Sequence, residues 1–399
     1  MAKLSANKKM VAGTLQQLGI PVSDSKLWDN TYLCMIGQQI LQSSSMQNSF
    51  FAMLVNKIGK MYLTSNRYEN QLKTFKKGTM PMGVAIEDIY INFQEGDDYD
   101  TESTLMTDEF KDDIISVYYV ADSYKKFYAK TSYDAFVQAF VSWDNMDKFI
   151  NGILSRLYDS QQLYEWKRTK QLLGNDFNET TGAMKRYEFN FYPNTFAQDL
   201  TKLLRATALN MVCPSATYNN FQEYAIANGY DNVTSQPITT FSSFNSLNLI
   251  VRNDCLADVD VDVLSMAFNI NKVEFLGKVH GVDNFGITEN ATSSDGQKTY
   301  TKLYDYKKKN KQTSETETHS VYDITNYNIE ENGSTYNIRL VAVICDDSFI
   351  HIEDTKEPMV AEFFDASNLI RTTYLHSWQL YGLCPFANAL AIYTKTLVK

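Results

Sequence analysis

The 399-residue sequence is poor in the residues that carry metal and redox chemistry, and it contains no long apolar segment. Its four histidines lie far apart along the chain, and its five cysteines include no Cys-x-x-Cys pair. An odd and scattered set of cysteines predicts buried free thiols in a reducing compartment instead of a disulfide framework. No apolar run approaches the roughly 20 residues that cross a bilayer, and the N-terminus lacks the apolar stretch of a signal peptide. We therefore expect a protein that is not secreted and makes no contact with a membrane.

Familiar catalytic and phosphate-binding motifs are also missing. The sequence contains no Gly-x-Ser-x-Gly, no Walker A loop and no Gly-x-Gly-x-x-Gly. The segment from Asp254 to Leu264 resembles a calcium loop, but the positions that need Gly and a bidentate Glu hold Val263 and Asn269. A helix start with acidic residues in its first turn explains this segment better. We expect neither an enzyme nor a bound cofactor, and a three-histidine zinc site formed by long-range convergence stays a minor alternative.

Glycine and proline are scarce, at 17 and 7 residues, which argues against a fibrous or low-complexity protein. Hydrophobic residues make up 44% of the chain and include 26 Tyr and 23 Phe, which is enough apolar material for a packed core. A chain of this length is expected to form two to three folding units. Aromatic residues spread along the whole chain favour extensive self-contact between subunits, although a glycan-binding face stays an alternative.

Positive charge is in the minority, with 37 Lys and Arg against 47 Asp and Glu and a formal net charge of −10. This balance disfavours direct binding of nucleic acid, which needs a basic face. The run "KKKNK" from Lys307 to Lys311 is more typical of a solvated loop tip than of a nucleic-acid patch. A second group of lysines, Lys73, Lys76 and Lys77, directly precedes a tract from Glu87 to Asp113 that holds eleven acidic residues and one lysine.

Helical and strand patterns occur together along the chain, which predicts an α+β fold. Residues 64–132 have the pattern of a long two-stranded excursion, with strands over 82–93 and 114–128 on either side of an acidic loop. The strongest helical pattern runs from Ser142 to Gly174, where apolar residues recur at helical spacing and glycine provides a natural stop. Further expected segments are helices over 48–63 and 196–211, a strand–helix–strand unit over 247–279, and a solvent-exposed polar insertion over 286–338.

Four segments of the sequence resemble the major capsid protein of small short-tailed phages of the φ29 type. They are "LKTFKKGTMPMGVAIEDIY" from Leu72, "AFVSWDNMDKFINGILSRLYDS" from Ala139, "ADVDVDVLSMAFNINKVEFLGKV" from Ala257 and "YLHSWQLYGLCPFANALAI" from Tyr374. The matches keep the same order, and together they extend from about residue 48 to the C-terminus.

The resemblance implies the Hong Kong 97-type capsid fold, which has an N-terminal arm, an extended β-hairpin loop, a peripheral domain with a long spine helix, and an axial domain. The division implied for this chain is an arm with short helices over 1–63, the extended loop over 64–132, the peripheral domain over 133–195, the axial domain over 196–285, the polar insertion over 286–338, and return strands completing both domains over 339–399. The φ29-type proteins carry an immunoglobulin-like domain beyond the region matching "FANALAI", and we expect that domain to be absent here. The insertion has no clear counterpart in the family.

The function implied by the resemblance is self-assembly into the hexamers and pentamers of an icosahedral phage head. The protein would be made in the bacterial host cytoplasm and end in the capsid of the virion. Its partners would be other copies of itself, the portal protein at one vertex, and further a scaffolding protein and a head fibre. Packaged double-stranded DNA would lie nearby without specific binding. We expect no covalent cross-links between subunits.

The separated charges are the candidate contacts between subunits, because the extended loop of one subunit lies across its neighbour in this fold. Exposed ion pairs contribute only about 0–1 kcal/mol each, so the charges are expected to set register and not to stabilise an isolated subunit. On that basis, reversing Lys76 and Lys77 to Glu is expected to leave the monomer folded and to impair assembly. The candidate residues are Lys73, Lys76, Lys77, Glu87, Asp88, Asp97, Asp98, Asp112 and Asp113. A glycan-binding or host-adhesion protein of the virion is the alternative function.

Overall fold

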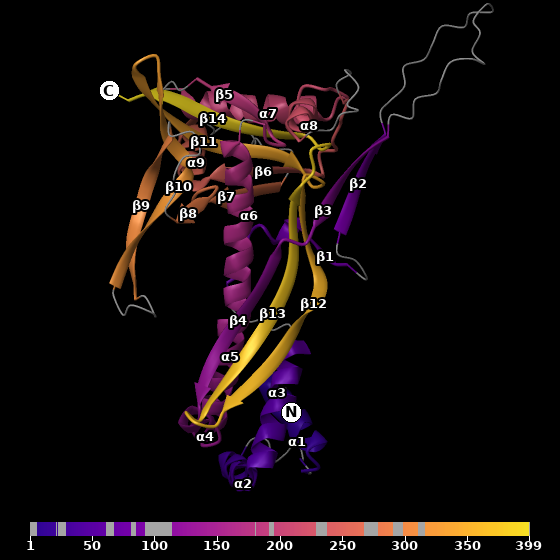
Figure 1. The fold of residues 1–399 in the computed structure, drawn as a ribbon, viewed down its shortest axis with the longest axis vertical. Helices are drawn as coiled ribbons and strands as arrows, with labels where there is room; N and C mark the ends of the chain where they lie inside the picture. The colour runs from indigo at the N-terminus through magenta and orange to yellow at the C-terminus, as the bar shows by residue number, and fades with distance from the viewer. Residues whose placement is uncertain are drawn as a thin grey trace, which may run out of the picture.

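A computed structural model shows two large sheets joined by one long helix, and a separate two-stranded sheet (Figure 1). The structure describes residues 6–20, 22, 29–60, 68–80, 85–91, 114–179, 181–190, 195–228, 238–266, 278–289, 298–309 and 316–398. One sheet lies across the upper end of the long helix. The second runs beside the lower part of that helix, where the N-terminal helices also gather.

The upper sheet has eight strands, and β11 lies near its centre because it pairs with β14, β10 and β6. Residues Val341 to Cys345 of β11 are all buried, as a continuous apolar run in a central strand requires. The strands of the upper sheet are β5 (Lys185–Phe189), β6 (Leu247–Arg252), β7 (Lys278–Val282), β8 (Ile287–Glu289), β9 (Lys298–Lys309), β10 (Thr316–Glu331), β11 (Ser334–Asp346) and β14 (Ala389–Leu397).

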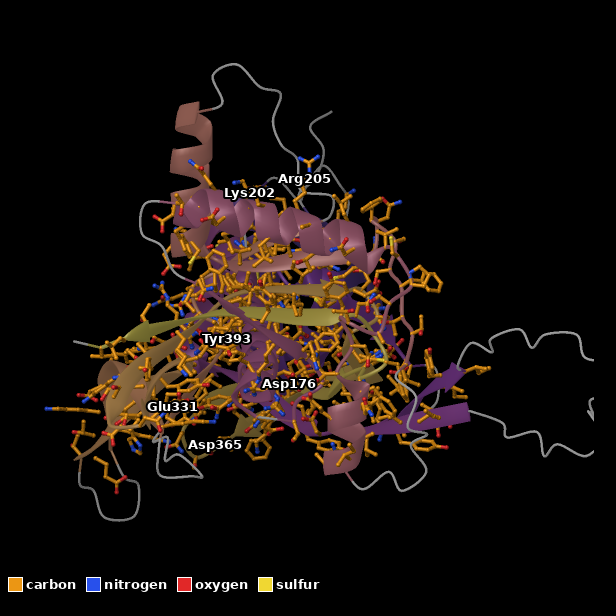
Figure 2. All side chains as sticks on the ribbon, turned by 90° about the horizontal axis from the view of Figure 1, so that it is seen from above. Asp176, Lys202, Arg205, Glu331, Asp365 and Tyr393 are labelled. Carbon is orange, nitrogen blue, oxygen red and sulfur yellow. The ribbon has the colours of Figure 1, made fainter. Side chains whose placement is uncertain are left out.

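Three helices accompany the upper sheet, namely α7 (Phe196–Met211), α8 (Phe221–Ala227) and α9 (Asn253–Met266). The apolar stripe of α7, which includes Leu200 and Leu204, packs against buried residues of β6 and β14. Lys202 and Arg205 lie on the opposite side of this helix and point away from the molecule (Figure 2). The expected helix over 196–211 and the expected strand–helix–strand unit over 247–279 are both confirmed, with α9 following β6 directly.

The lower sheet has the order β1-β12-β13-β4. Its strands are β1 (Lys76–Thr79), β12 (Ile350–Asp365), β13 (Ile370–Leu383) and β4 (Ser123–Ser132). The long strands β12, β13 and β4 pair antiparallel, whereas β1 adds parallel to β12. The inner face of this sheet contributes Phe127, Ala129, Val360 and Leu375 to a core shared with the N-terminal helices.

The N-terminal helices are α1 (Ala6–Gln17), α2 (Asn30–Leu41) and α3 (Ser44–Lys60), and α4 (Tyr133–Ala139) packs with them. Four phenylalanines from α3, α4 and the residue after α4 lie in mutual ring contact at the centre of this core. They are Phe50, Phe51, Phe136 and Phe140. The helix expected over 48–63 is confirmed as α3, which begins four residues earlier at Ser44, and residues 61–63 lie outside the described residues.

The predicted long helix is confirmed, and its end was placed too early. It consists of α5 (Trp143–Leu154), a π-helical turn (Ser155–Asp159) and α6 (Ser160–Asn178). Ser142 caps its start by accepting a hydrogen bond from the Asn145 backbone at 3.3 Å. Gly174 does not stop the helix, which continues to Asn178. Position 174 is buried, and a Cβ there would meet Ile324 at 2.9 Å, so close packing is the reason for glycine. None of the helices that the structure describes is long and apolar enough to cross a membrane.

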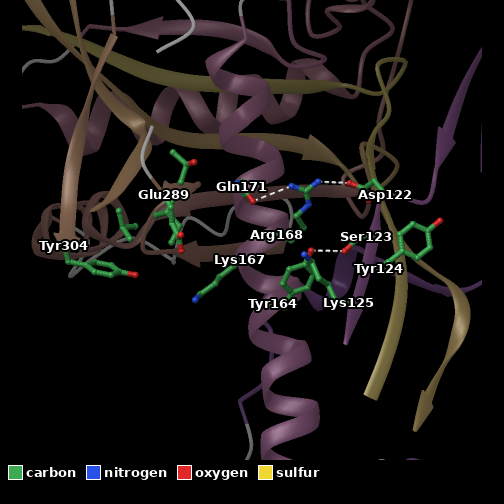
Figure 3. A pocket seen from close by; sticks show the side chains of 13 residues that line it. Asp122, Ser123, Tyr124, Lys125, Tyr164, Lys167, Arg168, Gln171, Glu289 and Tyr304 are labelled. Carbon is green, nitrogen blue, oxygen red and sulfur yellow. Dashed lines mark hydrogen bonds and ion pairs between the residues drawn. The ribbon is translucent and has the colours of Figure 1, made fainter. Parts of the chain in front are cut away.

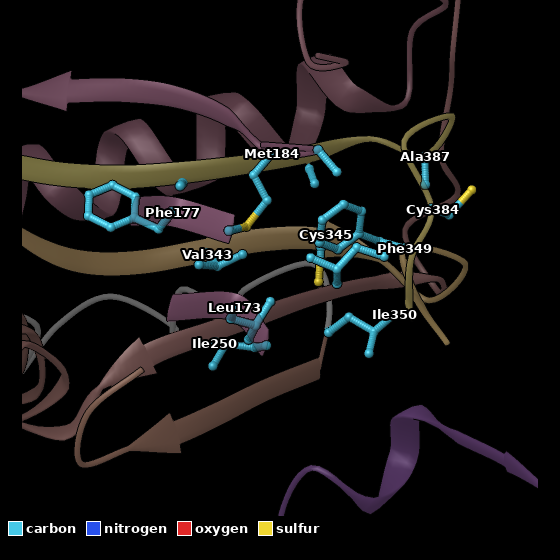
Figure 4. Close-up of a cluster of buried hydrophobic side chains, with 14 of the residues drawn as sticks. Leu173, Phe177, Met184, Ile250, Val343, Cys345, Phe349, Ile350, Cys384 and Ala387 are labelled. Carbon is cyan, nitrogen blue, oxygen red and sulfur yellow. The ribbon is translucent and has the colours of Figure 1, made fainter. Parts of the chain in front are cut away.

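The largest buried cluster fills the space between the upper end of this helix and the sheet above it (Figure 4). Leu173 and Phe177 of α6 pack there with Val343 and Cys345 of β11 and with Ile250 of β6. The turn that follows β13 adds Cys384 and Ala387 to the same cluster. This packing fixes the angle between the long helix and the upper sheet.

Two hairpins leave the body on opposite sides of the view in Figure 1. One pairs β2 (Ala85–Ile91) with β3 (Ile114–Val120), which confirms the predicted two-stranded excursion. The strand expected over 114–128 is divided, because the chain leaves β3 and enters the lower sheet as β4. The other hairpin pairs β9 with β10.

Solvent exposure was expected throughout 286–338, and this expectation is wrong for much of β10. Val321, Ile324 and Tyr327 are buried there, and β10 pairs with β8 and β9 at Val321 and with the central strand β11 from Asn326 onward. Lys307 and Lys308 are exposed near the end of β9, as expected of a solvated tip. Asn310 and Lys311 lie outside the described residues.

Candidate subunit interface

The β2–β3 hairpin has one face against the body and one face toward solvent. On the inner face, the Tyr90 hydroxyl donates to the Thr239 carbonyl at 2.7 Å, and the Tyr119 hydroxyl donates to the Leu383 carbonyl at 3.1 Å. The outer face carries four large apolar side chains that are 59–68% exposed, namely Ile89, Ile91, Tyr118 and Val120. Successive side chains of a strand point to opposite faces, and β2 accordingly alternates between exposed and half-buried positions. The hairpin therefore presents an apolar surface that a single subunit leaves in water.

Lys76 lies at the root of the hairpin and is paired inside the chain. Its Nζ atom lies 2.8 Å from a carboxylate oxygen of Glu165 and 2.9 Å from one of Asp354. Both carboxylates are almost fully buried, and the lysine side chain itself is only 19% exposed. Burial lowers the pKa of Lys76, but the charges of Glu165 and Asp354 outweigh burial and raise the pKa above its ordinary value. The lysine thus joins β1 to the spine helix and to β12.

Asp88 turns inward on β2 and meets groups from other segments. Its Oδ2 atom lies 2.8 Å from Nε2 of His351, and Lys77 Nζ lies 3.0 Å from Nδ1 of the same imidazole. Burial would raise the pKa of Asp88, but the His351 ring, the Cys384 thiol and the Lys77 ammonium together lower it below its ordinary value. These contacts attach the hairpin to the body of its own subunit.

The predicted contact residues therefore fall into three groups. Lys76 makes two ion pairs within the chain, so the expectation that a Lys76 reversal leaves the monomer folded conflicts with the structure, and Asp88 lies against His351 of its own chain. Lys73, Lys77 and Glu87 are exposed, and a hydrogen bond from Tyr118 to Glu87 raises the pKa of that phenol. Asp97, Asp98, Asp112 and Asp113 lie outside the described residues.

The sequence expectations missed a second surface, on the outer face of the lower sheet. The strand register brings twelve side chains to this side of β4, β13 and β12, and two acidic residues, Asp365 opposite Ile370 and Glu353 opposite Leu380, lie on the same side at its two ends. We call it the lysine-aromatic face, and its residues are Tyr124, Lys126, Tyr128, Lys130, Lys356, Met359, Ala361, Phe363, Thr372, Tyr374, His376 and Trp378.

Aromatic rings and lysines are interleaved on the lysine-aromatic face. The rings of Tyr128 and Tyr374 lie 6.4 Å apart, those of His376 and Trp378 are stacked at 5.9 Å, and Lys356 Nζ lies 5.7 Å from the Trp378 ring. Tyr124 and Phe363 are about 60% exposed. A face that is aromatic and basic over these twelve positions, in a chain of net charge −10, suits an acidic partner. The alternating sequence "YKKFYAK" over 124–130 was the available signal for it.

A polar groove of about 630 Å³ lies between α6, the start of β4 and the strands β8 to β10 (Figure 3). Within it, Arg168 donates to Asp122 at 2.6 Å, and the hydroxyls of Ser123 and Tyr164 lie 2.8 Å apart. Lys167 points toward the open side of the groove. The described residues that line it include no nucleophile paired with a base.

Curated relatives of the chain are phage major capsid proteins. The chain is 28% identical to the major capsid protein of Bacillus phage PZA over 255 residues, which cover 63% of this chain and 54% of that protein. It is 26% identical to the major capsid protein of Bacillus phage GA-1 over 369 residues, which cover 91% of this chain and 64% of that protein. The chain thus spans between about half and two thirds of the length of these relatives.

Solved capsid structures share the fold. A chain in the capsid structure of Staphylococcus phage Andhra superposes with a TM-score of 0.57 at 14% identity, covering 85% of this chain and 87% of its own length. A chain in the structure of the head fiber and inner core protein gp22 of bacteriophage P68 gives a TM-score of 0.56 at 16% identity, covering 83% and 86%. Together with the α+β architecture, these likenesses show the Hong Kong 97-type capsid fold.

A family model described as "Phi29-like phage major capsid protein" matches residues 14–393. This match takes in both sheets, the long helix and the β2–β3 hairpin. The glycan-binding alternative finds no support among the relatives and structures described above. Because the match spans nearly the whole sequence, the chain belongs to the Phi29-like phage major capsid protein family and is a capsid component of the virion.

Proposed function

We propose that this chain is the shell-forming subunit of an icosahedral phage head and assembles through its β2–β3 hairpin. Many copies would close into hexamers and pentamers around double-stranded DNA. The observation that carries the proposal is the exposed apolar outer face of the hairpin, which adjoins an acidic tract. Contacts of this kind are heterologous, because one patch docks on a different patch of the next subunit and rotation closes the ring.

The lysine-aromatic face of the neighbouring subunit is the proposed receptor for the hairpin. The hairpin and its connecting tract carry eleven acidic residues, of which Asp88 turns inward, whereas the lysine-aromatic face carries three lysines and has Asp365 and Glu353 at its ends. Full burial of one large apolar side chain stabilises by roughly 1.5–3 kcal/mol, against about 0–1 kcal/mol for an exposed ion pair. Apolar burial would therefore supply most of the affinity, and the charges would select register and partner.

Exposed residues among the predicted contacts keep their proposed role between subunits. Lys73 and Glu87 face solvent, and Glu87 also accepts a hydrogen bond from Tyr118 on the neighbouring strand of its own hairpin. Asp97, Asp98, Asp112 and Asp113 belong to the acidic tract that would dock. Lys76 and Asp88 are proposed to position the hairpin root for this contact.

Further proposed partners are the portal protein at one vertex, a scaffolding protein and a head fibre. Packaged DNA would lie near the shell without specific binding, because a chain of net charge −10 repels phosphate. We also propose that the chain has no catalytic activity and forms no covalent cross-links with its neighbours. A ladder of covalent multimers on denaturing gels of intact particles would contradict the last point.

Negative-stain microscopy of the purified chain tests the proposed function. Shell formation predicts icosahedral or tubular assemblies, or closed rings of six and five subunits where a scaffolding protein is needed. Uniform small particles under every assembly condition, together with saturable binding of a sugar in solution, would overturn the proposal in favour of a glycan-binding protein.

A further inference from the structure

Three side chains of the types that bind zinc converge at the root of the hairpin. Asp88 comes from β2, His351 is the second residue of β12, and Cys384 follows the end of β13. One ligand atom from each, a carboxylate oxygen, an imidazole nitrogen and a thiol sulfur, lies within 4.8 Å of the other two. His351 and Cys384 are 5% and 6% exposed, so the cluster lies largely out of water. Thiolate, imidazole and carboxylate are the ligands that Zn²⁺ takes in proteins.

The Asp88 carboxyl accepts a hydrogen bond from the Cys384 thiol, but two atoms of the cluster, one oxygen and one nitrogen, lack a hydrogen bond of good geometry. Asp88 Oδ2 and His351 Nε2 are 2.8 Å apart, yet neither has a partner at a hydrogen-bonding angle among the described residues. Both atoms are buried, and buried polar atoms of this kind need a compensating contact. Both atoms also lie within 4.8 Å of the Cys384 sulfur, so a cation placed among the three could contact all of them.

The turn after β13 is shaped around the Cys384 sulfur. Burial is the main influence on this thiol, and its pKa is raised to about 12. Hydrogen bonds from the backbone of Phe386 and Ala387 lower the pKa in part. Amide groups directed at sulfur stabilise a thiolate and orient it once a metal has displaced its proton. The ring of Tyr119 covers one side of the cluster, 5.5 Å from the His351 ring.

We propose that Asp88, His351 and Cys384 bind one Zn²⁺ ion, with water in the fourth position. Binding would replace the proton of the Cys384 thiol with a zinc–sulfur bond and release that proton to solvent. The ion would join β2 to β12 and to the turn after β13, and so hold the hairpin at a fixed angle to the subunit body.

Lys77 controls the affinity of this site through the tautomer of His351. The ammonium group can only donate, so its 3.0 Å contact with Nδ1 requires that Nδ1 accept and that Nε2 carry the proton. Zinc at Nε2 requires the opposite tautomer, whose Nδ1–H faces Lys77. Replacing Lys77 with Gln supplies a carbonyl oxygen that accepts from Nδ1–H, as the outer partners of zinc-bound histidines do. Lys77→Gln therefore tightens zinc binding.

Calorimetric titration of Zn²⁺ into the chelator-treated full chain tests the proposal, in two buffers of different ionisation enthalpy. The expected result is one zinc per chain with release of about one proton. Cys384→Ser and Asp88→Asn each weaken binding roughly tenfold or more, and Lys77→Gln tightens it. Cys213→Ser, which alters an exposed free thiol, leaves binding unchanged. Circular dichroism of each apo variant verifies its fold, and Cys384→Ser decides the matter if Asp88→Asn fails to fold.

Two results would overturn the zinc site. The first is absence of stoichiometric binding in both the wild-type chain and Lys77→Gln. The second is equal affinity in Cys384→Ser and Cys213→Ser, since that would place the metal on other surface groups. Cobalt substitution gives an independent readout, because a thiolate-to-cobalt absorption band should appear in the wild-type chain and be lost in Cys384→Ser.

Discussion

Lys76 shows how one lysine can hold two buried acidic side chains at a structural joint. Glu165 and Asp354 are 2% and 8% exposed, so their charges need a compensating partner. Both partners lie far along the chain from Lys76, and no local pattern in "FKKGT" distinguishes Lys76 from its neighbour Lys77. Which side chains pair with which was therefore the least predictable part of the candidate site. The clustering of lysines before the acidic tract was visible in the sequence.

Replacing Lys76 with Ala is expected to destabilise the subunit by about 3 kcal/mol, because two buried carboxylates lose their counter-charge. Urea unfolding of the unassembled chain measures the loss. Lys73→Ala is the matched control, since this exposed lysine lies in the same segment and its removal should change stability by less than about 0.5 kcal/mol. Equal stability of the two variants would contradict the role assigned to Lys76.

Asp176, near the C-terminal end of the spine helix, should make the unfolding free energy of the subunit depend on pH. Burial raises its pKa to about 6, although hydrogen bonds from the Ala183 and Met184 backbones lower the pKa in part. The folded state therefore binds this proton more tightly than the unfolded state, whose pKa is 3.8. The contribution of Asp176 to stability should fall as pH rises from about 4 to about 6, by roughly 3 kcal/mol in total, and stay level above that range.

Comparison with Asp176→Asn isolates this effect, because the amide cannot titrate. The difference in unfolding free energy between wild type and variant should favour wild type most strongly at the acidic end of this range. A difference that stays constant across these pH values would show that Asp176 titrates normally.

At the scale of elements, local pattern predicted helices and strands well and their junctions less well. The helix over 196–211 and the paired strands around the acidic tract follow from periodicity alone, because one face of each element is buried. Gly174 was misjudged as a helix end because the close approach of Ile324 is a long-range contact. The lysine-aromatic face was missed for a similar reason, since three separate strands build it.

The outer face of the hairpin gives an assembly prediction. Ile89→Thr combined with Ile91→Thr should leave the subunit folded, because both side chains are exposed and Thr keeps the preference for strands. Assembly should be lost, because each copy loses apolar surface that its neighbour would cover. Sedimentation of shells against free subunits measures the effect, with Ile226→Thr on α8 as an equally exposed control. If both variants fail alike, the hairpin has no special role.

The lysine-aromatic face gives the complementary prediction. Lys126→Glu with Lys130→Glu should slow or block assembly at low salt, because an acidic tract would meet two new acids. Added salt should relieve the defect in part through screening. Lys202→Glu with Arg205→Glu on the outward side of α7 is the matched double reversal (Figure 2). Assembly of the first variant at the control rate would exclude this face as the receptor.

At the scale of the whole molecule, the two hairpins extend on opposite sides of a body that is held rigid by one long helix (Figure 1). A ring of subunits needs this kind of shape, because a donor surface on each copy must reach a receptor on the next copy. Net charge, the two-stranded excursion and the family resemblance made the architecture predictable from the sequence. The receptor surface became apparent only when the strand register was known.

A cryo-electron reconstruction of the assembled particle tests the central claim most directly. The account predicts that the β2–β3 hairpin of each subunit covers the lysine-aromatic face of its neighbour, with Ile89 and Tyr118 buried in the contact. A map in which those two side chains face solvent, or in which another element covers the lysine-aromatic face, would contradict it.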